Sequence, residues 1–242
     1  MVGKPKTAEM HPGPGFRIRT AIDRPPPEVV AAIGRFETPV ISDLMNRLYT
    51  MTPEIRGLSE PHHVVGPACT VKVYPGDNLM VHKSLDIAQP GDVVVVDTTG
   101  SERAAVLGDL VSTKARHRGI AGFVVDGFIR DLPGIRRLGD FPVFARGVTP
   151  FGPLHRGPGE INHPVSAGGI VVMPGDIIVG DPNGVLVVPR EVAEELLERL
   201  LGRTAVEAEY MSAVARGDFS NQWVDDILAG SGLRIDGAAS RR

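Results

Sequence analysis

The stretch Pro90-Gly91-Asp92-Val93-Val94-Val95-Val96-Asp97 decides the fold class of this chain. Its first three residues are typical of a tight turn, because proline presets φ and glycine accepts a positive φ. The four valines that follow form a short apolar run bounded by turn residues, which is typical of a strand buried on both faces. The pattern returns at Pro174-Gly175-Asp176, which leads into Ile177-Ile178-Val179-Gly180-Asp181. The two stretches predict a reused turn-and-strand unit in the sheet system of an α/β protein.

Helical and strand-like segments alternate around this stretch. A helix is expected from Asp109 to His117, because basic residues crowd its last turn and Gly119 stands where a C′ glycine belongs. We further expect a strand over 120–125, a turn at Asp126-Gly127, a short helix over 132–138, a strand over 143–145, an amphipathic helix over 191–201 and another helix over 205–214. Two helices are expected earlier, around 29–33 and 40–48; Ser42 and Asp43 could cap the second if it starts later.

Composition divides the chain into three parts. Residues 1–27 are rich in proline and glycine and predict an N-terminal arm, because Pro25-Pro26-Pro27 cannot lie inside a helix or a central strand. Residues 28–202 form the expected α/β domain. Residues 203–242 form a C-terminal helical extension with a frayed Gly/Ser/Arg-rich tail.

The overall composition excludes several classes of protein. The chain has 242 residues, 42% hydrophobic and 23% charged, which is ordinary for a globular protein. A net charge of −3 provides no global basic field, so no nucleic-acid partner is expected. The single cysteine, Cys69, can form neither an internal disulfide nor a multi-cysteine metal site. Without an apolar segment long enough for a membrane or signal peptide, a cytoplasmic location is expected.

Two short segments carry the candidate chemistry. Gly108-Asp109-Leu110-Val111 opens the expected helix, where free backbone amides favour an anion such as a carboxylate; a plain Asp N-cap is the alternative. Arg130-Asp131 follows a strand end, where open α/β sheets place ligands. Arginine can grip a carboxylate and aspartate can anchor a hard cation, although a surface salt bridge would use the same pair.

Together, Asp109, twenty intervening residues and Arg130-Asp131 resemble the signature of the RraA-like family, which includes the class II pyruvate aldolases. The resemblance runs from about Ser42 to Pro189. It also includes Gly76-Asp77-Asn78-Leu79, Gln89-Pro90-Gly91-Asp92-Val93, Gly119-Ile120-Ala121-Gly122, Asp126-Gly127, Pro164-Val165, Gly168-Gly169, and Pro174-Gly175-Asp176 through Asp181 to Gly184-Val185. The resemblance implies a single-domain β/β/α swivelling fold.

The resemblance also implies a role for each site residue. Gly108, Asp109, Leu110 and Val111 would bind the pyruvyl carboxylate, and Arg130 would contact the keto oxygen and stabilise the enolate. Asp131 would be the main protein ligand of a divalent metal, and Asp109 would hold a metal-bound or catalytic water. One or two carboxylates with several waters suit Mg²⁺ or Mn²⁺.

The implied activity is that of a lyase. It would cleave a 4-hydroxy-2-oxo diacid such as 4-hydroxy-4-methyl-2-oxoglutarate through a pyruvate enolate, and oxaloacetate decarboxylation is a natural second reaction. A non-catalytic regulator of the RraA type, which acts on ribonuclease E, is the alternative, and the same enolate chemistry on another substrate is a third reading. By resemblance the chain is expected to form a homotrimer or homohexamer with sites at subunit interfaces.

The remaining signals are weaker. His82 follows the Gly76-Asp77-Asn78 turn and either faces the site or has a structural role, whereas His155 and His163 are expected to be loop residues. Neither a Walker motif nor a Gly-x-Gly-x-x-Gly fingerprint opens a helix, which argues against a dinucleotide-dependent dehydrogenase or a cofactor-bound methyltransferase.

Overall fold

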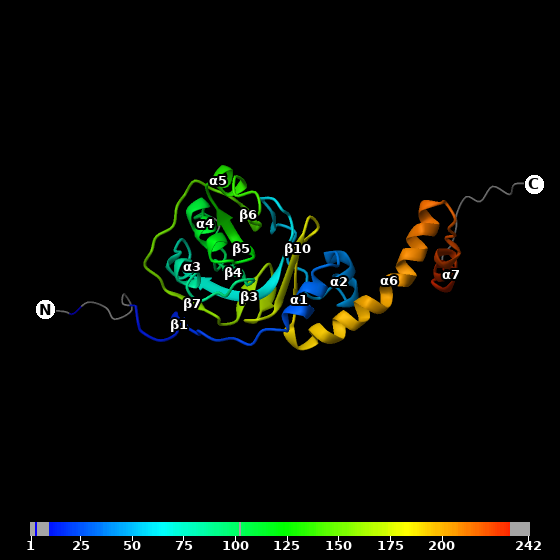
Figure 1. Ribbon diagram of the computed structural model, residues 1–242, viewed down its shortest axis with the longest axis horizontal. Coiled ribbons are helices and arrows are strands. Elements are labelled where there is room, and N and C mark those ends of the chain that lie inside the picture. The colour runs from blue at the N-terminus through cyan, green and yellow to red at the C-terminus, as the bar shows by residue number, and fades with distance from the viewer. Residues whose placement is uncertain (1–2, 4–9, 102, 233–242) are drawn as a thin grey trace, which may run out of the picture. The chain divides into compact units, whose positions relative to one another are not determined.

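Four parallel strands form the centre of the main sheet in the computed structural model of the chain (Figure 1). They are β3 (Val64–Val73), β4 (Val93–Asp97), β5 (Gly122–Ile129) and β6 (Val143–Val148). The run of valines lies in β4, between β3 and β5, and every residue of β4 is buried. The expectation of a strand covered on both faces is therefore confirmed.

Shorter strands extend both edges of this sheet. β7 (Gly159–Ile161) pairs antiparallel with β3, and β1 (Phe16–Ile18) pairs parallel with β7. At the other edge, β2 (Arg56–Gly57) pairs antiparallel with β6. The N-terminal arm thus contributes an outer strand.

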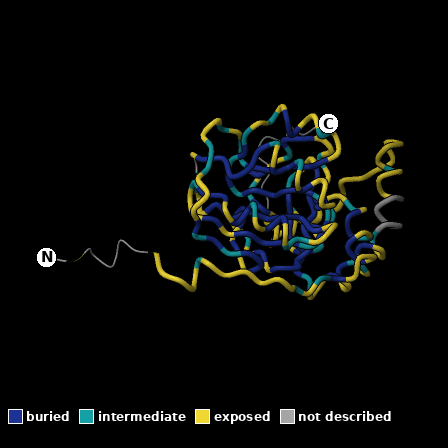
Figure 2. The backbone as a smooth tube through the Cα atoms, turned by 60° about the vertical axis from the view of Figure 1, so that its left-hand side comes forward, coloured by how far each residue is buried: buried dark blue, intermediate teal, exposed yellow. Residues whose placement is uncertain are grey.

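A second β layer packs on one face of the main sheet. β10 (Ile177–Asp181) pairs antiparallel with β11 (Gly184–Val188) and with the first half of β3, so β3 belongs to both layers. β8 (Val165–Ala167) and β9 (Ile170–Val172) form a separate antiparallel pair. The apolar side chains between the layers form one buried cluster. Figure 2 shows buried backbone concentrated in the interior of the chain's main body.

Helices cover the outer faces of both layers. α3 (Leu79–Ser84), α4 (Asp109–His117) and α5 (Leu132–Arg136) pack on the main sheet (Figure 1). α1 (Pro27–Ile33), α2 (Thr38–Leu44) and the first residues of α6 (Ala193–Ala215), which follow the short 3-10 helix η2 (Arg190–Val192), pack on the second layer. The fold is therefore the mixed α/β architecture that was expected.

The repeated Pro-Gly-Asp turns adopt the same local geometry. Gly91 has φ 89° and Gly175 has φ 88°, a region in which an L side chain is strained. The carboxylate of Asp92 accepts a hydrogen bond of 2.8 Å from Gln89 N, and that of Asp176 accepts one of 2.8 Å from Met173 N. Each aspartate therefore closes its turn by bonding the residue that precedes it, in the same way in both copies of the reused unit.

Several expected boundaries are wrong. Asp126-Gly127 is not a turn but lies inside β5, which continues to Ile129 with a register shift against β6. The segments 191–201 and 205–214 are joined in the single helix α6. Ser42 and Asp43 do not cap α2, because the helix begins at Thr38 and the Asp181 carboxylate accepts the Thr38 N–H at 2.7 Å.

The structure describes residue 3, residues 10–101 and residues 103–232, without the side chains of residues 204–208. The expected tail over 233–242 and most of the first nine residues of the arm lie outside the described residues. Two compact units are distinguished, residues 1–200 and residues 201–242. The second holds the rest of α6 and α7 (Gln222–Gly230). Within the described residues, no helix has the length and apolar character needed to cross a membrane.

Candidate active site

Backbone pairing beyond the end of β4 brings the two candidate segments together. The segment that precedes α4 runs beside the end of β5: Val106 N donates to Phe128 O at 3.0 Å, and Arg130 N donates to Leu107 O at 3.0 Å. Gly108 therefore lies next to Arg130 and Asp131, although more than twenty residues separate them in the sequence.

Gly108 is required where these segments meet. A Cβ on Gly108 would lie 2.3 Å from Asp131 Oδ2 and 3.0 Å from Arg130 Cγ, so any side chain there would displace both groups. α4 begins at the next residue, and Gly108 O accepts hydrogen bonds from both the N–H and the hydroxyl of Ser112 at 3.0 Å. The amides of Asp109, Leu110 and Val111 belong to the first helical turn, which leaves them available to an anion.

Arg130 and Asp131 lie at the carboxyl end of β5. Arg130 Nε donates to Asp131 Oδ2 at 3.1 Å, and both side chains are 43% exposed. Asp131 has φ 54° and ψ 35°, a left-handed conformation that aspartate tolerates better than most residues. The backbone turns sharply here into α5, since Asp131 O accepts the N–H groups of Gly134 and Ile135.

These groups line one cavity of about 210 Å³, formed by Asn78, His82, Leu107, Gly108, Leu110, Val111, Arg130, Asp131, Pro153 and His155. The predicted residues Gly108, Leu110, Val111, Arg130 and Asp131 are thus brought together. Asp109 is not part of the cavity wall; its carboxylate lies against Gly134 of α5. His82 also lines the cavity, as the first of the two readings of that residue expects.

Sequence reasoning missed Asn78 and His155. Asn78 Nδ2 donates to Val106 O at 2.8 Å, and its Oδ1 lies 2.6 Å from His155 Nδ1. His155 in turn packs edge-on against His82, with ring centroids 5.4 Å apart. Asn78 lies in one of the motifs of the resemblance and could have been found there. No local signal distinguishes His155, because only the pairing of residues 154 and 156 with Gly76 and Asp77 brings it to the cavity.

His82 gives this wall a neutral, polar group. Burial lowers the pKa of His82, and nearby His155 and Lys114 lower it further. His82 is therefore uncharged at neutral pH and is suited to donating a hydrogen bond rather than to providing a positive charge.

The donor set can be tested against a divalent metal. Within the described residues, no three His, Cys, Asp or Glu side chains are grouped so that they could hold an ion. The cavity instead offers one half-exposed carboxylate, Asp131, at its mouth. A hard cation that keeps most of its waters, such as Mg²⁺ or Mn²⁺, fits such a set, whereas a structural zinc site needs four protein ligands.

Comparison with known proteins gives the family. Residues 38–187 match the model of the RraA-like family, described as Aldolase/RraA. The chain belongs to the RraA-like family. A relative from Halalkalibacterium halodurans, named "Putative 4-hydroxy-4-methyl-2-oxoglutarate aldolase", is 47% identical over 162 residues, which are 67% of this chain and 77% of the relative.

Two solved structures that are similar to this chain have different descriptions. An uncharacterized protein from Pseudomonas syringae pv. tomato has a TM-score of 0.73 and 27% identity, covering 81% of this chain and 92% of that one. RraAS2 from Streptomyces coelicolor, described as an unusual member of the RNase ES inhibitor RraA protein family, has a TM-score of 0.67 and 31% identity, covering 81% and 99%. The RraA-like fold therefore does not by itself decide between an enzyme and a regulator.

Proposed function

We propose that this protein is a divalent-metal-dependent aldolase that cleaves a 4-hydroxy-2-oxo diacid, such as 4-hydroxy-4-methyl-2-oxoglutarate, to pyruvate and a second 2-oxo acid. The observation that carries the proposal is the meeting of the α4 N-terminus with Arg130 and Asp131 at one cavity. The aldolase name of the relative that is 47% identical supports the same assignment.

Binding of the pyruvyl end follows from the α4 N-terminus. The substrate carboxylate accepts hydrogen bonds from the first-turn amides, which also carry the positive end of the helix dipole. Leu110 and Val111 line the cavity beside these amides and provide its apolar surface. The 2-keto group is thereby directed towards Arg130.

Cleavage of the C3–C4 bond moves an electron pair towards the keto oxygen. Arg130 places a guanidinium where this negative charge develops, and a preorganised donor of this kind is worth about 10²–10³ in kcat. The carboxylate of Asp109 lies against Gly134, outside the cavity wall, so in this proposal Asp109 would act only through a water that removes the proton from the C4 hydroxyl. Asp131 would hold the divalent cation, which as a Lewis acid supplies further stabilisation of the charge on the keto oxygen.

The same charge develops when oxaloacetate loses CO₂, so oxaloacetate decarboxylation is proposed as a second reaction of the site. The proposal also includes assembly into a homotrimer or homohexamer, which light scattering of the purified protein would test. A protein that only regulates a partner carries out no enolate chemistry, so it would have no need of Asp109, Arg130 and Asp131 together.

Pyruvate release from purified protein tests the proposal. 4-Hydroxy-4-methyl-2-oxoglutarate and oxaloacetate are offered in separate coupled assays, after EDTA treatment and after Mg²⁺ or Mn²⁺ is restored. Metal-restored pyruvate from the hydroxy acid is the expected result. Pyruvate from oxaloacetate alone would support the enolate chemistry but show that the hydroxy acid is not the substrate. Absence of pyruvate from both acids would favour a regulatory protein.

A further inference from the structure

A second cavity adjoins the candidate active site. It has a volume of about 480 Å³ and is lined by His82, Leu85 and Asp86 from α3 and the residues after it, and by Lys114, His117 and Arg118 from α4 and its end. His82 lines both cavities and therefore stands at their boundary. Together the two cavities follow α4 from its N-terminus towards its C-terminus, beside α3.

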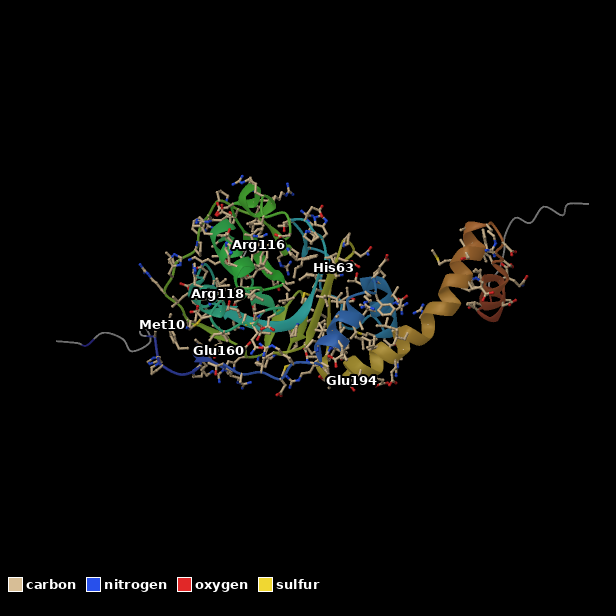
Figure 3. All side chains as sticks on the ribbon, viewed as in Figure 1. Met10, His63, Arg116, Arg118, Glu160 and Glu194 are labelled. Atoms are coloured by element: carbon tan, nitrogen blue, oxygen red, sulfur yellow. The ribbon has the colours of Figure 1, made fainter. Side chains whose placement is uncertain are left out.

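Most of the charge in this second cavity is already paired. Arg118 donates to Leu85 O at 2.9 Å and forms an ion pair of 2.8 Å with Asp86. Figure 3 shows Arg118 next to α3. The other oxygen of Asp86 forms an ion pair of 3.1 Å with Lys83 Nζ. Lys83 and Arg118 hold the pKa of Asp86 below its usual value. The negative charge of Asp86 is therefore balanced by Lys83 and Arg118, and Arg118 is held at the edge of the cavity.

Lys114 differs from these groups. Within the described part of the chain, its ammonium forms neither a hydrogen bond nor an ion pair, although its charge lowers the pKa of nearby His82. Lys114 is therefore the cation of this wall that is available to a ligand, and the adjacent imidazole offers a neutral hydrogen-bond donor.

The spacing along α4 is short enough for one ligand to reach from the first-turn amides to the side chain of Lys114. Leu110 and Lys114 lie four residues apart, which places them on one helix face with a rise of about 6 Å. The terminal carboxyl carbons of an extended five-carbon chain are separated by a similar distance, about 5 Å, because each carbon–carbon bond advances a zigzag chain by slightly over 1 Å. A carboxylate held at the first turn of α4 would thus direct the other end of such a ligand to Lys114.

We propose that Lys114, assisted by His82, binds the carboxylate at the far end of the substrate and makes the site selective for dicarboxylic 2-oxo acids. This inference deepens the proposed function and rests on it for the placement of the pyruvyl end. The role of Lys114 is one of specificity, because its position along α4 is a full turn away from the amides that would hold the reacting 2-oxo acid.

Binding of two probes that differ only in the far carboxylate tests the inference without relying on turnover. 2-Oxoglutarate and 2-oxopentanoate are titrated calorimetrically into the full chain with Mg²⁺ present. The wild-type protein is expected to bind the diacid at least tenfold more tightly, the size of a charge-assisted hydrogen bond. Lys114→Met should remove this preference, and Lys114→Arg should keep most of it.

Lys83→Met is the matched control, because Lys83 lies on neighbouring α3 and is already paired with Asp86. Its preference for the diacid should stay within twofold of wild type. A wild-type protein without the preference, a Lys114→Met variant that keeps it, or no binding of either acid would overturn the inference. Pyruvate release is measured in parallel: a diacid preference without turnover would refute the aldolase, and turnover without the preference would refute only the role of Lys114.

Discussion

Gly134 of α5 and Asp109 of α4 are in such close contact that no side chain fits between them. A Cβ on Gly134 would lie 2.3 Å from Asp109 Oδ2 and 2.6 Å from Asp109 Cβ. The glycine therefore sets where the Asp109 carboxylate can lie relative to the cavity. This contact links the packing of two helices to the position of a proposed catalytic side chain.

Gly134→Ala is expected to reduce pyruvate release at least tenfold, because the added methyl group must displace Asp109. The change in stability should be smaller than usual for a clash, since alanine favours a helix over glycine by up to about 1 kcal/mol. Gly202→Ala is the control: Gly202 is also helical, and nothing lies within 4 Å of a Cβ built on it. That variant should keep full activity, and equal activity losses in both variants would contradict the proposed role of the Asp109 position.

Asp131→Asn is expected to abolish metal-dependent turnover while the melting temperature stays within a few degrees of wild type. Asparagine keeps the shape of the side chain and tolerates the left-handed conformation, but it removes the charge. Asp131→Ala should lose turnover too, with a destabilisation of about 1 kcal/mol, because alanine is strained at φ 54°. Pyruvate assays and thermal melts check both variants, and wild-type turnover in either would refute the assignment of Asp131.

Arg130→Lys is expected to lower kcat about a hundredfold. An ammonium cannot reproduce the planar fork that donates to Asp131 and to the developing negative charge. The guanidinium lies close to the backbone of Gly152, where an added Cβ would be 2.5 Å from Arg130 Nη1. Arg137→Lys, at the exposed residue that follows α5, serves as the control. Retention of kcat by Arg130→Lys would mean that Arg130 does not touch the reacting group.

Arg24→Met is expected to lower the free energy of unfolding by about 3 kcal/mol, measured in urea. Arg24 donates two hydrogen bonds, of 2.8 Å and 2.7 Å, to the Asp92 carboxylate, which is only 1% exposed. Removing one partner of a buried pair leaves an uncompensated charge. Arg116→Met breaks the corresponding pair with Asp140, which lies at the surface, and should change stability little. An equal loss of unfolding free energy in the two variants would contradict a stabilising role of the Arg24–Asp92 pair.

Acid should release the N-terminal arm before the domain unfolds. The Arg17 guanidinium, together with the Gly15 N–H, holds the pKa of Glu160 below its usual value. Because the folded-state pKa is depressed, the contact stabilises fully above the ordinary glutamate pKa, near 4.3, and is lost as the pH falls through the folded-state value. Hydrogen exchange of residues 16–18, corrected for the intrinsic rate, should therefore accelerate between pH 5 and pH 3. Glu160→Gln should remove this pH dependence. If the exchange of residues 16–18 depends on pH in the same way in wild type and in Glu160→Gln, Glu160 does not hold the arm.

Local sequence determines the elements whose signals lie within a few residues of each other. α4 runs from Asp109 to His117, as expected, because Gly108 precedes its first turn and Gly119, with φ 75°, ends it. The Pro-Gly-Asp turns and the buried strands after them were likewise predictable, since proline, glycine and the turn-closing aspartate act on their immediate neighbours. The pairing of Asp109 with Arg130-Asp131 was visible only as a motif, since nothing in the spacing shows that the segments touch.

Tertiary structure decided the features that depend on distant partners. Asp126-Gly127 has the composition of a turn, yet the residues around it pair with β6, and the Asp126 carboxylate binds Arg146 and Gly168 N. His155 enters the site only because its segment pairs with the one that carries Asn78. Turn propensity is a small local free-energy preference, whereas strand pairing and buried hydrogen bonds add over many contacts. Local chemistry therefore determined the elements, and the sum of long-range contacts determined which side chains share the cavity.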